Sequence, residues 1–387
     1  MYRQLNPPQR ILMGPGPSEA HPRVYAALAA PIVGHLDPEF LTIMEETKDL
    51  LRYVFRTKNP VTLPVSGTGG AGMEACLTNL LEPGDKAVVC IHGFFGTRMR
   101  EIAERCGATP IAVEAPWGRP IDPADVERAV KESGAKLVAI VHAETSTGVL
   151  QPLGDICRVA KAHGALVVLD TVTSLGGCDV RIDDWGIDAA YSGTQKCLGG
   201  PPGLSPVTFN DRAMEVAQKR RTKVRSWYLD MTLIAQYWGE SHTYHHTAPV
   251  SLNYALREAL LLVQEEGLED RVARHRKNHL ALVAGLEAMG LEMFVEKAHC
   301  LPSLNTVKVP DGVDEAKARR RLLDRFSLEI GAGLGPLRGK IWRIGLMGYA
   351  SSARNVATCL TALEDALRAQ GHRVPEGAGV KAALALL

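Results

Sequence analysis

From residue 61 onward the sequence alternates between short apolar runs and segments with helical periodicity. The apolar runs are 61–65, 87–91, 136–141, 165–169 and 189–191, and the helical segments between them include 72–81, 97–105, 122–132 and 154–163. Strands that are apolar throughout are buried on both faces, and a parallel sheet covered by helices buries them in this way. The sequence therefore predicts an α/β fold with a mostly parallel sheet between helices.

The rest of the chain predicts a second, smaller unit. A chain of 387 residues is too long for one small core. The helical segments 249–266 and 268–289 are followed by a strand at 305–309, a helix at 313–326, a strand at 340–344 and a helix at 352–370. We therefore expect an extended arm over 1–18, a large domain over 19–262 and a small α+β domain over 263–387.

Composition excludes several classes of partner. Lys+Arg 44 against Asp+Glu 43 leaves a net charge of +1, so neither nucleic acid nor an anionic membrane is expected to bind. No apolar run reaches the roughly 18–20 residues that a membrane helix needs. The start of the sequence has no apolar segment of the signal-peptide kind, and we expect a cytoplasmic protein.

Cysteine and histidine patterns do not predict a metal site. The eight cysteines are scattered without a C-x-x-C pair, which is typical of reduced thiols that pack in the core. His245 and His246 are adjacent, but no third ligand follows at a suitable spacing.

A glycine-rich turn after the first apolar run offers a place for a phosphate. Gly67, Gly69 and Gly72 match the spacing G-x-G-x-x-G of dinucleotide-binding turns. That fingerprint also requires an acidic residue at the end of the next strand, and segment 91–96 has none. Glycines before a helix nevertheless let backbone N–H groups approach an anion. A phosphate site is expected, with an NAD-linked oxidoreductase as the alternative from a different class.

Asp170 and Lys196 follow two of the apolar runs. Asp170 ends the run 165–169, where the ligands of open α/β sheets bind. Lys196 lies in a loop rich in glycine and proline after the run 189–191. Alone, each residue has an ordinary structural interpretation. Together with a phosphate turn they are what a pyridoxal phosphate (PLP) site needs, namely a lysine for the aldehyde and a carboxylate for the pyridine nitrogen.

These residues carry a resemblance to a known family. The chain resembles the class V (fold type I) PLP-dependent aminotransferases, in particular the alanine–glyoxylate and serine–glyoxylate (serine–pyruvate) group, over nearly its whole length. The motifs are 14–18 (GPGPS), 66–69 (SGTG), 82–85 (EPGD), 144–148 (ETSTG), Asp170, 192–196 (SGTQK) and 244–247 (YHHT). The resemblance implies a large domain with a seven-stranded, mostly parallel sheet.

The resemblance also implies roles for individual residues. Lys196 would form the Schiff base with the cofactor and move the proton during the reaction, and Asp170 would pair with the pyridinium nitrogen. The other residues expected to contact the cofactor are Thr68, Gly69, Gly70 and Gln195 at the phosphate, Phe95 and Val172 on the two ring faces, Thr145 at the phenolic oxygen, and Tyr244 and Thr247 at the phosphate of the neighbouring subunit. Arg343 would bind the substrate carboxylate, with Gly16 and Thr145 beside it.

Two positions depart from the family pattern. Phe95 stands where relatives often have Trp or Tyr, and Gly70 replaces a side chain that helps to hold the phosphate in some relatives. Both departures predict a lower affinity for the cofactor.

The resemblance implies transamination from a small amino acid, alanine or serine, to glyoxylate or pyruvate, with ping-pong kinetics. (S)-Ureidoglycine–glyoxylate and 2-aminoethylphosphonate–pyruvate transamination are the alternatives. A cysteine desulfurase would need a nucleophilic cysteine shortly before Arg343, and residues 327–342 contain none. The small substrates and a second copy of the chain are the expected partners, since Tyr244 and Thr247 would complete the neighbouring site.

Overall fold

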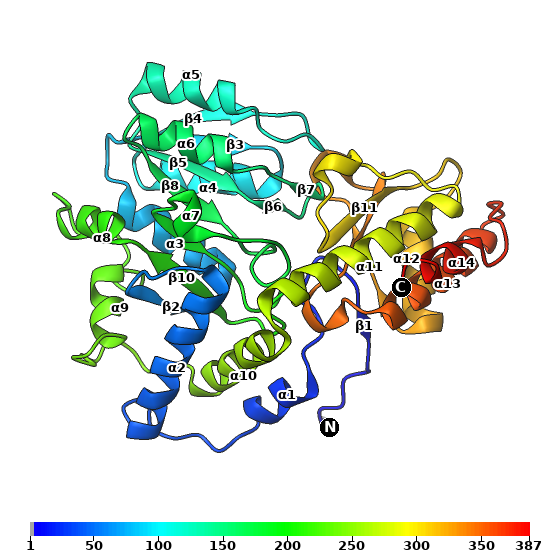
Figure 1. Cartoon of the computed structure of the whole chain (residues 1–387), viewed down its shortest axis with the longest axis horizontal. Helices are drawn as coiled ribbons and strands as arrows, with labels where there is room; N and C mark the ends of the chain where they lie inside the picture. The colour runs from blue at the N-terminus through cyan, green and yellow to red at the C-terminus, as the bar shows by residue number, and fades with distance from the viewer. Residues whose placement is uncertain (1–3) are drawn as a thin grey trace.

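A seven-stranded sheet forms the centre of the larger part of the molecule (Figure 1). The computed structural model describes residues 4–387. In sheet order the strands are β2 (Val61–Ser66), β10 (Leu204–Phe209), β9 (Ala189–Tyr191), β8 (Leu166–Asp170), β5 (Leu137–Val141), β3 (Lys86–Ile91) and β4 (Thr109–Glu114). Strand β10 is antiparallel to both neighbours, and all the other pairs are parallel. The predicted fold class is confirmed.

Helices cover both faces of this sheet because successive strand residues point to opposite sides. Val89 and Val168 belong to one apolar cluster, and their neighbours Val88 and Val167 belong to another. The first cluster includes residues of α3 (Gly69–Leu80), α4 (Phe94–Arg105), α8 (Asp211–Gln218) and α9 (Met231–Tyr237). The second includes residues of α5 (Pro123–Ser133), α6 (Gly154–Ala162) and α10 (Val250–Glu266), and α2 (Pro38–Phe55) contributes to both.

A smaller antiparallel sheet and four helices form the C-terminal part. The sheet has the order β11 (Leu304–Lys308), β14 (Ile341–Gly345) and β13 (Gly331–Ala332). The helices are α11 (Leu268–Ala288), α12 (Glu315–Phe326), α13 (Ala353–Arg368) and α14 (Ala378–Leu384). Buried Trp342 and Leu363 belong to their common core. Gly267, between α10 and α11, lies close to the predicted domain boundary, which stays a prediction.

The N-terminal arm connects the small sheet region to the Lys196 loop. Strand β1 (Ile11–Leu12) pairs in parallel with β12 (Leu328–Glu329). A few residues further on, the Ser18 hydroxyl donates a hydrogen bond of 2.8 Å to the Lys196 carbonyl. The arm then continues into α1 (Pro22–Leu28). It is therefore part of the folded structure and reaches the centre of the molecule.

The remaining short elements are β6 (Ala143–Glu144), β7 (Val149–Leu150), α7 (Ile182–Trp185) and three 3-10 turns at Lys297–His299, Gly335–Leu337 and Gly348–Ala350. Within residues 4–387 there is no helix whose length and apolar character would suffice to span a membrane.

Candidate active site

A cavity of about 150 Å³ lies at the carboxyl ends of the parallel strands. This is the edge of an open α/β sheet where ligands bind. The lining residues come from the ends of β5 and β8, from the loops that follow, and from the starts of α3 and α4. They are Thr68, Gly69, Gly70, Met73, Phe95, Arg98, Val141, Ala143, Thr145, Asp170, Val172, Thr173, Gln195 and Lys196. Most of the residues expected to hold the cofactor are therefore brought together.

Lys196 extends into this cavity, and its environment favours the neutral amine. Its ammonium nitrogen donates to the backbone carbonyl of Pro15. Burial lowers the pKa of Lys196 from 10.5 to about 8, and the nearby charge of Arg343 adds to this effect while Cys197 and Asp170 oppose it. A lysine with such a pKa exchanges protons readily near neutral pH. Lys196 is thus suited to nucleophilic attack on a carbonyl and to proton transfer.

Gly16 lies directly against the lysine side chain. Its φ of +109° is a conformation that favours glycine. A Cβ atom at this position would lie 2.4 Å from Lys196 Nζ. Only glycine leaves room for the lysine here, so Gly16 is brought to the site as expected.

Asp170 lies at the end of β8, and two donors hold its carboxylate. Oδ1 accepts a hydrogen bond of 2.8 Å from the Val172 N–H, and Oδ2 accepts one of 2.7 Å from the Tyr191 hydroxyl. Burial raises the pKa of Asp170 to about 6, although these two hydrogen bonds and the charge of Lys196 lower it. Tyr191 was not predicted to have a role in the site. Its place follows from the register of β8 and β9, in which Asp170 lies beside Tyr191.

The start of α3 presents backbone N–H groups that suit an anion after the glycine turn. Helix α3 begins at Gly69, and the preceding Thr68 makes no capping hydrogen bond with its side chain. The first N–H groups of a helix have no partner within the helix and favour a phosphate. The buried Oε1 atom of Gln195 also has no hydrogen-bond partner among residues 4–387. The Gln195 amide is therefore free to turn its NH₂ group toward an anion.

Phe95 is placed by the first turn of α4. Its N–H donates a hydrogen bond of 3.1 Å to Glu144 Oε2, and the Phe94 N–H donates one of 2.9 Å to the Ser146 hydroxyl. Ser146 also donates to Glu144 through its N–H and its hydroxyl. Burial raises the pKa of Glu144 to about 7 against these hydrogen bonds. The loop that carries Thr145 thus caps the helix that carries Phe95.

Arg343 reaches the site from β14. Its Nη1 donates a hydrogen bond of 3.2 Å to the Thr145 carbonyl, and its Nε donates one of 2.6 Å to the Ala332 carbonyl. Burial lowers the pKa of Arg343 to about 10. Within residues 4–387 this guanidinium forms no ion pair with a carboxylate. A buried cation of this kind is suited to an anionic substrate group.

Arg98 lines the cavity although it was not predicted as a site residue. Its guanidinium carbon lies 5.1 Å from the centre of the Phe95 ring and 5.3 Å from that of Phe94. This is the geometry of a cation–π contact. Arg98 follows Phe95 by three residues on one helix face, so a helix starting at Phe94 would have indicated it.

Tyr244 and Thr247 are not among the residues that line the cavity of their own chain. Tyr244 is 59% exposed, and its ring lies 5.4 Å from that of His35. Thr247 is also exposed. His245 and His246 bond to each other through their Nδ1 atoms at 2.7 Å. The segment 244–247 therefore presents two polar side chains on the surface, as a role at a neighbouring site requires.

The chemistry of this donor set fits PLP. The start of α3 and Gln195 suit its phosphate, Lys196 suits its aldehyde, and Asp170 suits a protonated ring nitrogen. The space around Gly70 at the start of α3 is open, because a Cβ there would have a single neighbour within 4 Å, Thr68 Oγ1 at 4.0 Å.

Comparisons with known proteins identify the family of the chain. The family model for class-V aminotransferases matches residues 20–337. The chain is 42% identical to the (S)-ureidoglycine–glyoxylate transaminase of Bacillus subtilis over 99% of this chain and 96% of that protein, and 42% identical to the alanine–glyoxylate aminotransferase of Drosophila melanogaster over 95% of each.

Solved structures give the same assignment. The ureidoglycine–glyoxylate aminotransferase from Bacillus subtilis superposes with a TM-score of 0.98 at 43% identity over 99% of both chains. The alanine–glyoxylate aminotransferase from Nostoc sp. superposes with a TM-score of 0.94 at 49% identity, over 95% of this chain and 98% of that one. The chain is therefore a PLP-dependent enzyme of the class-V aminotransferase family.

Proposed function

We propose that this aminotransferase transfers the amino group of a small amino acid, alanine or serine, to glyoxylate or pyruvate. The observation that carries the proposal is the shared acceptor of its relatives. The Bacillus and Drosophila proteins have different donors in their names, but both names contain glyoxylate. We therefore place glyoxylate first among the acceptors.

Lys196 is the proposed proton carrier of the reaction. When bound, PLP supplies an aldehyde that takes up the amino group and a ring that accepts electrons. The pKa of Lys196, which burial lowers to about 8, allows its amine to take a proton from the substrate Cα and to return it. Asp170 would hold the protonated ring nitrogen through its negative charge, which the Tyr191 hydroxyl supports.

Arg343 is the proposed carboxylate-binding residue. It is buried, it carries no ion pair within residues 4–387, and it bonds to the carbonyl of Thr145. A guanidinium binds a carboxylate through two parallel hydrogen bonds, which fixes the orientation of the substrate. Gly16 and Thr145 would border the same subsite. Alanine, serine, glyoxylate and pyruvate share this carboxylate.

We also propose that the enzyme acts as a homodimer in which Tyr244 and Thr247 hold the cofactor phosphate of the neighbouring subunit. The exposure of both side chains and their absence from the cavity of their own chain support this arrangement. Two copies related by a two-fold axis would complete each other's sites in the same way.

(S)-Ureidoglycine is the second candidate donor. The specific observation that favours it is the TM-score of 0.98 over 99% of both chains with the Bacillus ureidoglycine enzyme. Ureidoglycine differs from alanine beyond Cα, so the distinction depends on the side-chain pocket. A 2-aminoethylphosphonate donor would need a second cation in the site, and Arg98 is the residue in the cavity that could supply it.

A panel of donors and acceptors tests the proposal. Alanine, serine, ureidoglycine and 2-aminoethylphosphonate are each paired with glyoxylate, pyruvate and 2-oxoglutarate, and amino transfer is followed by product analysis. We expect alanine or serine with glyoxylate to give the highest kcat/KM. Faster transfer from ureidoglycine would replace the proposed donor, and a preference for 2-oxoglutarate would refute the proposed acceptor.

The role of Lys196 is tested separately. The Lys196→Ala protein should lose both turnover and the absorbance of the lysine-bound cofactor. Lys317→Ala, at a lysine whose side chain is 78% exposed, is the control and should keep both. Full activity of the Lys196→Ala protein would disprove the role.

A further inference from the structure

Three loops meet at Cys197, the residue after the proposed catalytic lysine. One follows β8 and contains Gly177, one contains Lys196 itself, and one follows β14 and contains Gly348. A Cβ atom at Gly177 would lie 2.5 Å from Cys197 Sγ, and one at Gly348 would lie 2.9 Å from the Cys197 carbonyl oxygen. Two of these backbones thus approach Cys197 as closely as glycine allows.

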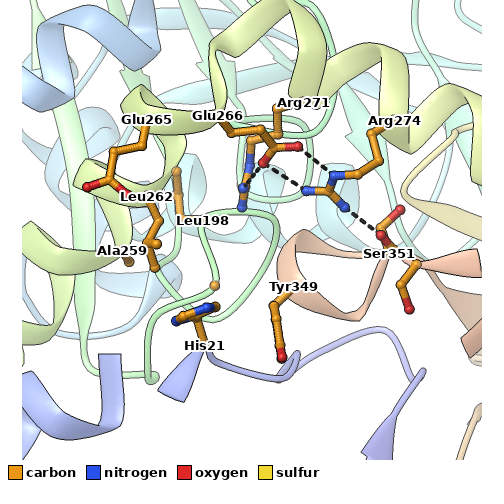
Figure 2. Close-up of a pocket in the computed structure, with 12 residues that line it drawn as sticks. His21, Leu198, Ala259, Leu262, Glu265, Glu266, Arg271, Arg274, Tyr349 and Ser351 are labelled. Carbon is orange, nitrogen blue, oxygen red and sulfur yellow. Dashed lines mark hydrogen bonds and ion pairs between the residues drawn. The ribbon is translucent and has the colours of Figure 1, made fainter. Parts of the chain in front are cut away.

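The Arg271 side chain bonds to two of these loops. Its Nη2 donates a hydrogen bond of 2.8 Å to the Cys197 carbonyl, and its Nε donates one of 3.0 Å to the Gly176 carbonyl. Its third donor, Nη1, lies 2.6 Å from Glu266 Oε2 (Figure 2). Arg271 is 6% exposed, so little water competes for these bonds. One planar group therefore fixes the spacing between the Gly176 loop and the lysine loop.

The third loop is held by the neighbours of Arg271 on α11. The Arg274 Nη1 donates to the Gly348 carbonyl. It also donates to the Ser351 carbonyl, and the Arg274 Nε donates to Glu266 Oε1 (Figure 2). His275 Nε2 accepts a hydrogen bond of 3.0 Å from the Gly348 N–H. Its Nδ1 lies 2.7 Å from the Arg271 carbonyl, and burial lowers the pKa of His275 to about 3. The imidazole is therefore neutral, with its proton on Nδ1.

A second cavity, of about 460 Å³, borders this network. Leu198 and Gly199, which directly follow Cys197, line it together with Ala259, Leu262, Arg271 and Arg274 (Figure 2). The Cys197 and Leu198 side chains are buried in apolar clusters. Packing and the hydrogen bond from Arg271 to the Cys197 carbonyl therefore hold the lysine loop together beside this open space.

We propose that Arg271, oriented by Glu266, is a positioning residue that holds Lys196 in line with the cofactor site. The proposal rests on the proposed role of Lys196. The Cys197 carbonyl is one residue from Lys196, so a displaced peptide at this point moves the lysine Cα directly. A misplacement of about 1 Å can reduce a catalytic rate by roughly 100-fold. Arg271 itself is not among the residues that line the proposed cofactor cavity.

Substitutions on one helix test the proposal in the holoenzyme. Arg271→Met removes all three hydrogen bonds, and Arg271→Lys keeps the charge but offers one ammonium group where two carbonyls need donors. The matched control is Arg276→Met, at an exposed arginine on the same helix. We expect Arg271→Met to lower kcat by roughly tenfold or more while KM for glyoxylate changes less than about twofold, with Arg271→Lys intermediate.

A spectroscopic titration separates positioning from general stability. The absorbance of the bound cofactor reports protonation at its bond to the lysine, and we expect its pH midpoint to shift in Arg271→Met and to be unchanged in Arg276→Met. If Arg271 had a purely structural role, its loss would lower the unfolding temperature. The protein that remains folded would then keep the wild-type pH midpoint of the cofactor absorbance. An Arg271→Met protein with the wild-type midpoint and a kcat within about twofold of wild type would overturn the proposal.

The adjacent cavity permits a second, independent test. In Arg271→Ala, added guanidinium can enter through the cavity and take the place of the missing side chain. We expect guanidinium at low millimolar concentration to restore part of the kcat and of the pH midpoint, while sodium chloride at the same ionic strength restores neither. The proposal would be contradicted if guanidinium did not rescue Arg271→Ala and the Arg271→Lys protein kept the wild-type pH midpoint of the cofactor absorbance.

Borohydride reduction followed by peptide mapping keeps the two proposals distinguishable. This treatment fixes the cofactor to the lysine that bears it. A label on a lysine other than 196 in the wild-type protein would refute the proposed function of Lys196. A label on Lys196 in both wild type and Arg271→Met, at equal rates and with equal pH dependence, would refute only the role of Arg271.

Discussion

Tyr191 and Asp170 form the most informative pair of side chains in the site. Both are buried, and the 2.7 Å hydrogen bond between them is one of two that support the carboxylate. Removing the hydroxyl should make the ionised Asp170 less stable by about 1.5 kcal/mol, the scale of a hydrogen bond to a charged group. We predict that Tyr191→Phe weakens PLP binding to the apoprotein by roughly tenfold.

An absorbance titration of the apoprotein with PLP measures this effect. The control is Tyr237→Phe, since Tyr237 is equally buried and donates its hydroxyl hydrogen bond to the His35 carbonyl. Equal affinities of the Tyr191→Phe protein and wild type would contradict a role for Tyr191 in supporting Asp170.

Glu144 should make the stability of the apoprotein depend on pH. Burial raises its pKa from 4.5 to about 7, so between these values the folded protein holds a proton that the unfolded chain has released. The folded state is therefore favoured at low pH and loses this advantage as the pH rises to about 7. The full effect is about 3 kcal/mol.

Glu144→Gln removes this titration. The substitution can also change the free energy of unfolding by an amount that does not depend on pH. Beyond that constant amount, the stability of the variant relative to wild type should improve between about pH 5 and about pH 8. Urea unfolding of both apoproteins at the two pH values measures the difference. If the free energies of unfolding of the two proteins differ by the same amount at both pH values, Glu144 does not carry the raised pKa.

At the scale of single residues, the sequence was sufficient where a motif fixes the position. Lys196 and Asp170 follow apolar runs, and the sheet brings both strand ends to one edge. Tyr191 and Arg98 could not be assigned, because their places depend on the register of β8 and β9 and on the first residue of α4. The roles of the site residues stay predictions.

Helix α3 has two glycines with opposite expected effects. A Cβ at Gly72 would lie 2.1 Å from Ser205 Oγ and 2.9 Å from Tyr191 Cβ, so the helix would have to move away from the sheet. A Cβ at Gly70 has free space around it. We predict that Gly72→Ala destabilises the protein by about 2–3 kcal/mol. Gly70→Ala should stabilise the apoprotein by about 0.5 kcal/mol.

Urea unfolding of the two apoproteins checks this prediction. The two variants add the same methyl group to the same helix, so the helix propensity of alanine cannot explain a difference in sign. Equal effects of the two substitutions would show that the contact between α3 and Ser205 is not as close as described.

Among the secondary-structure elements, buried parallel strands were predicted best. Strand β9 was expected at 189–191 and is found there. Strand β4 lies at the sheet edge, and Val113 is its one buried residue, so it was not recognised as a buried strand. Strand β10 contains Pro206, which is uncommon within a sheet. Helices α3 and α4 begin three residues before their predicted starts, because glycines and a phenylalanine pair open them.

For the whole molecule, the proposed dimer predicts that defective subunits complement each other. We consider a hybrid dimer of a Lys196→Ala subunit and a Tyr244→Ala subunit. If Tyr244 contributes to the site of the neighbouring subunit, one site of this hybrid has both a native Lys196 and a native Tyr244. If Tyr244 contributes to the site of its own subunit, neither site has both. Random mixing makes half of the dimers hybrids, so about a quarter of the wild-type sites should be restored. The mixture is assayed at a cofactor concentration at which the Tyr244→Ala protein alone is mostly free of PLP.

The matched control mixes Lys196→Ala with the double variant that carries both substitutions. This hybrid has no site with a native lysine and should stay inactive. Failure of the first mixture to gain activity, with hybrid formation verified by mass, would show that Tyr244 does not complete the neighbouring site.

The pairing of β1 with β12 has a consequence for how the protein is made. Residues 11 and 12 are synthesised long before their partners at 328 and 329. Until those partners are made, the arm that brings the Pro15 carbonyl to Lys196 lacks its anchoring strand. We therefore expect the lysine site of a nascent chain to stay unfinished at first, and to become competent for catalysis only once residues 328 and 329 have been added and can pair with the arm.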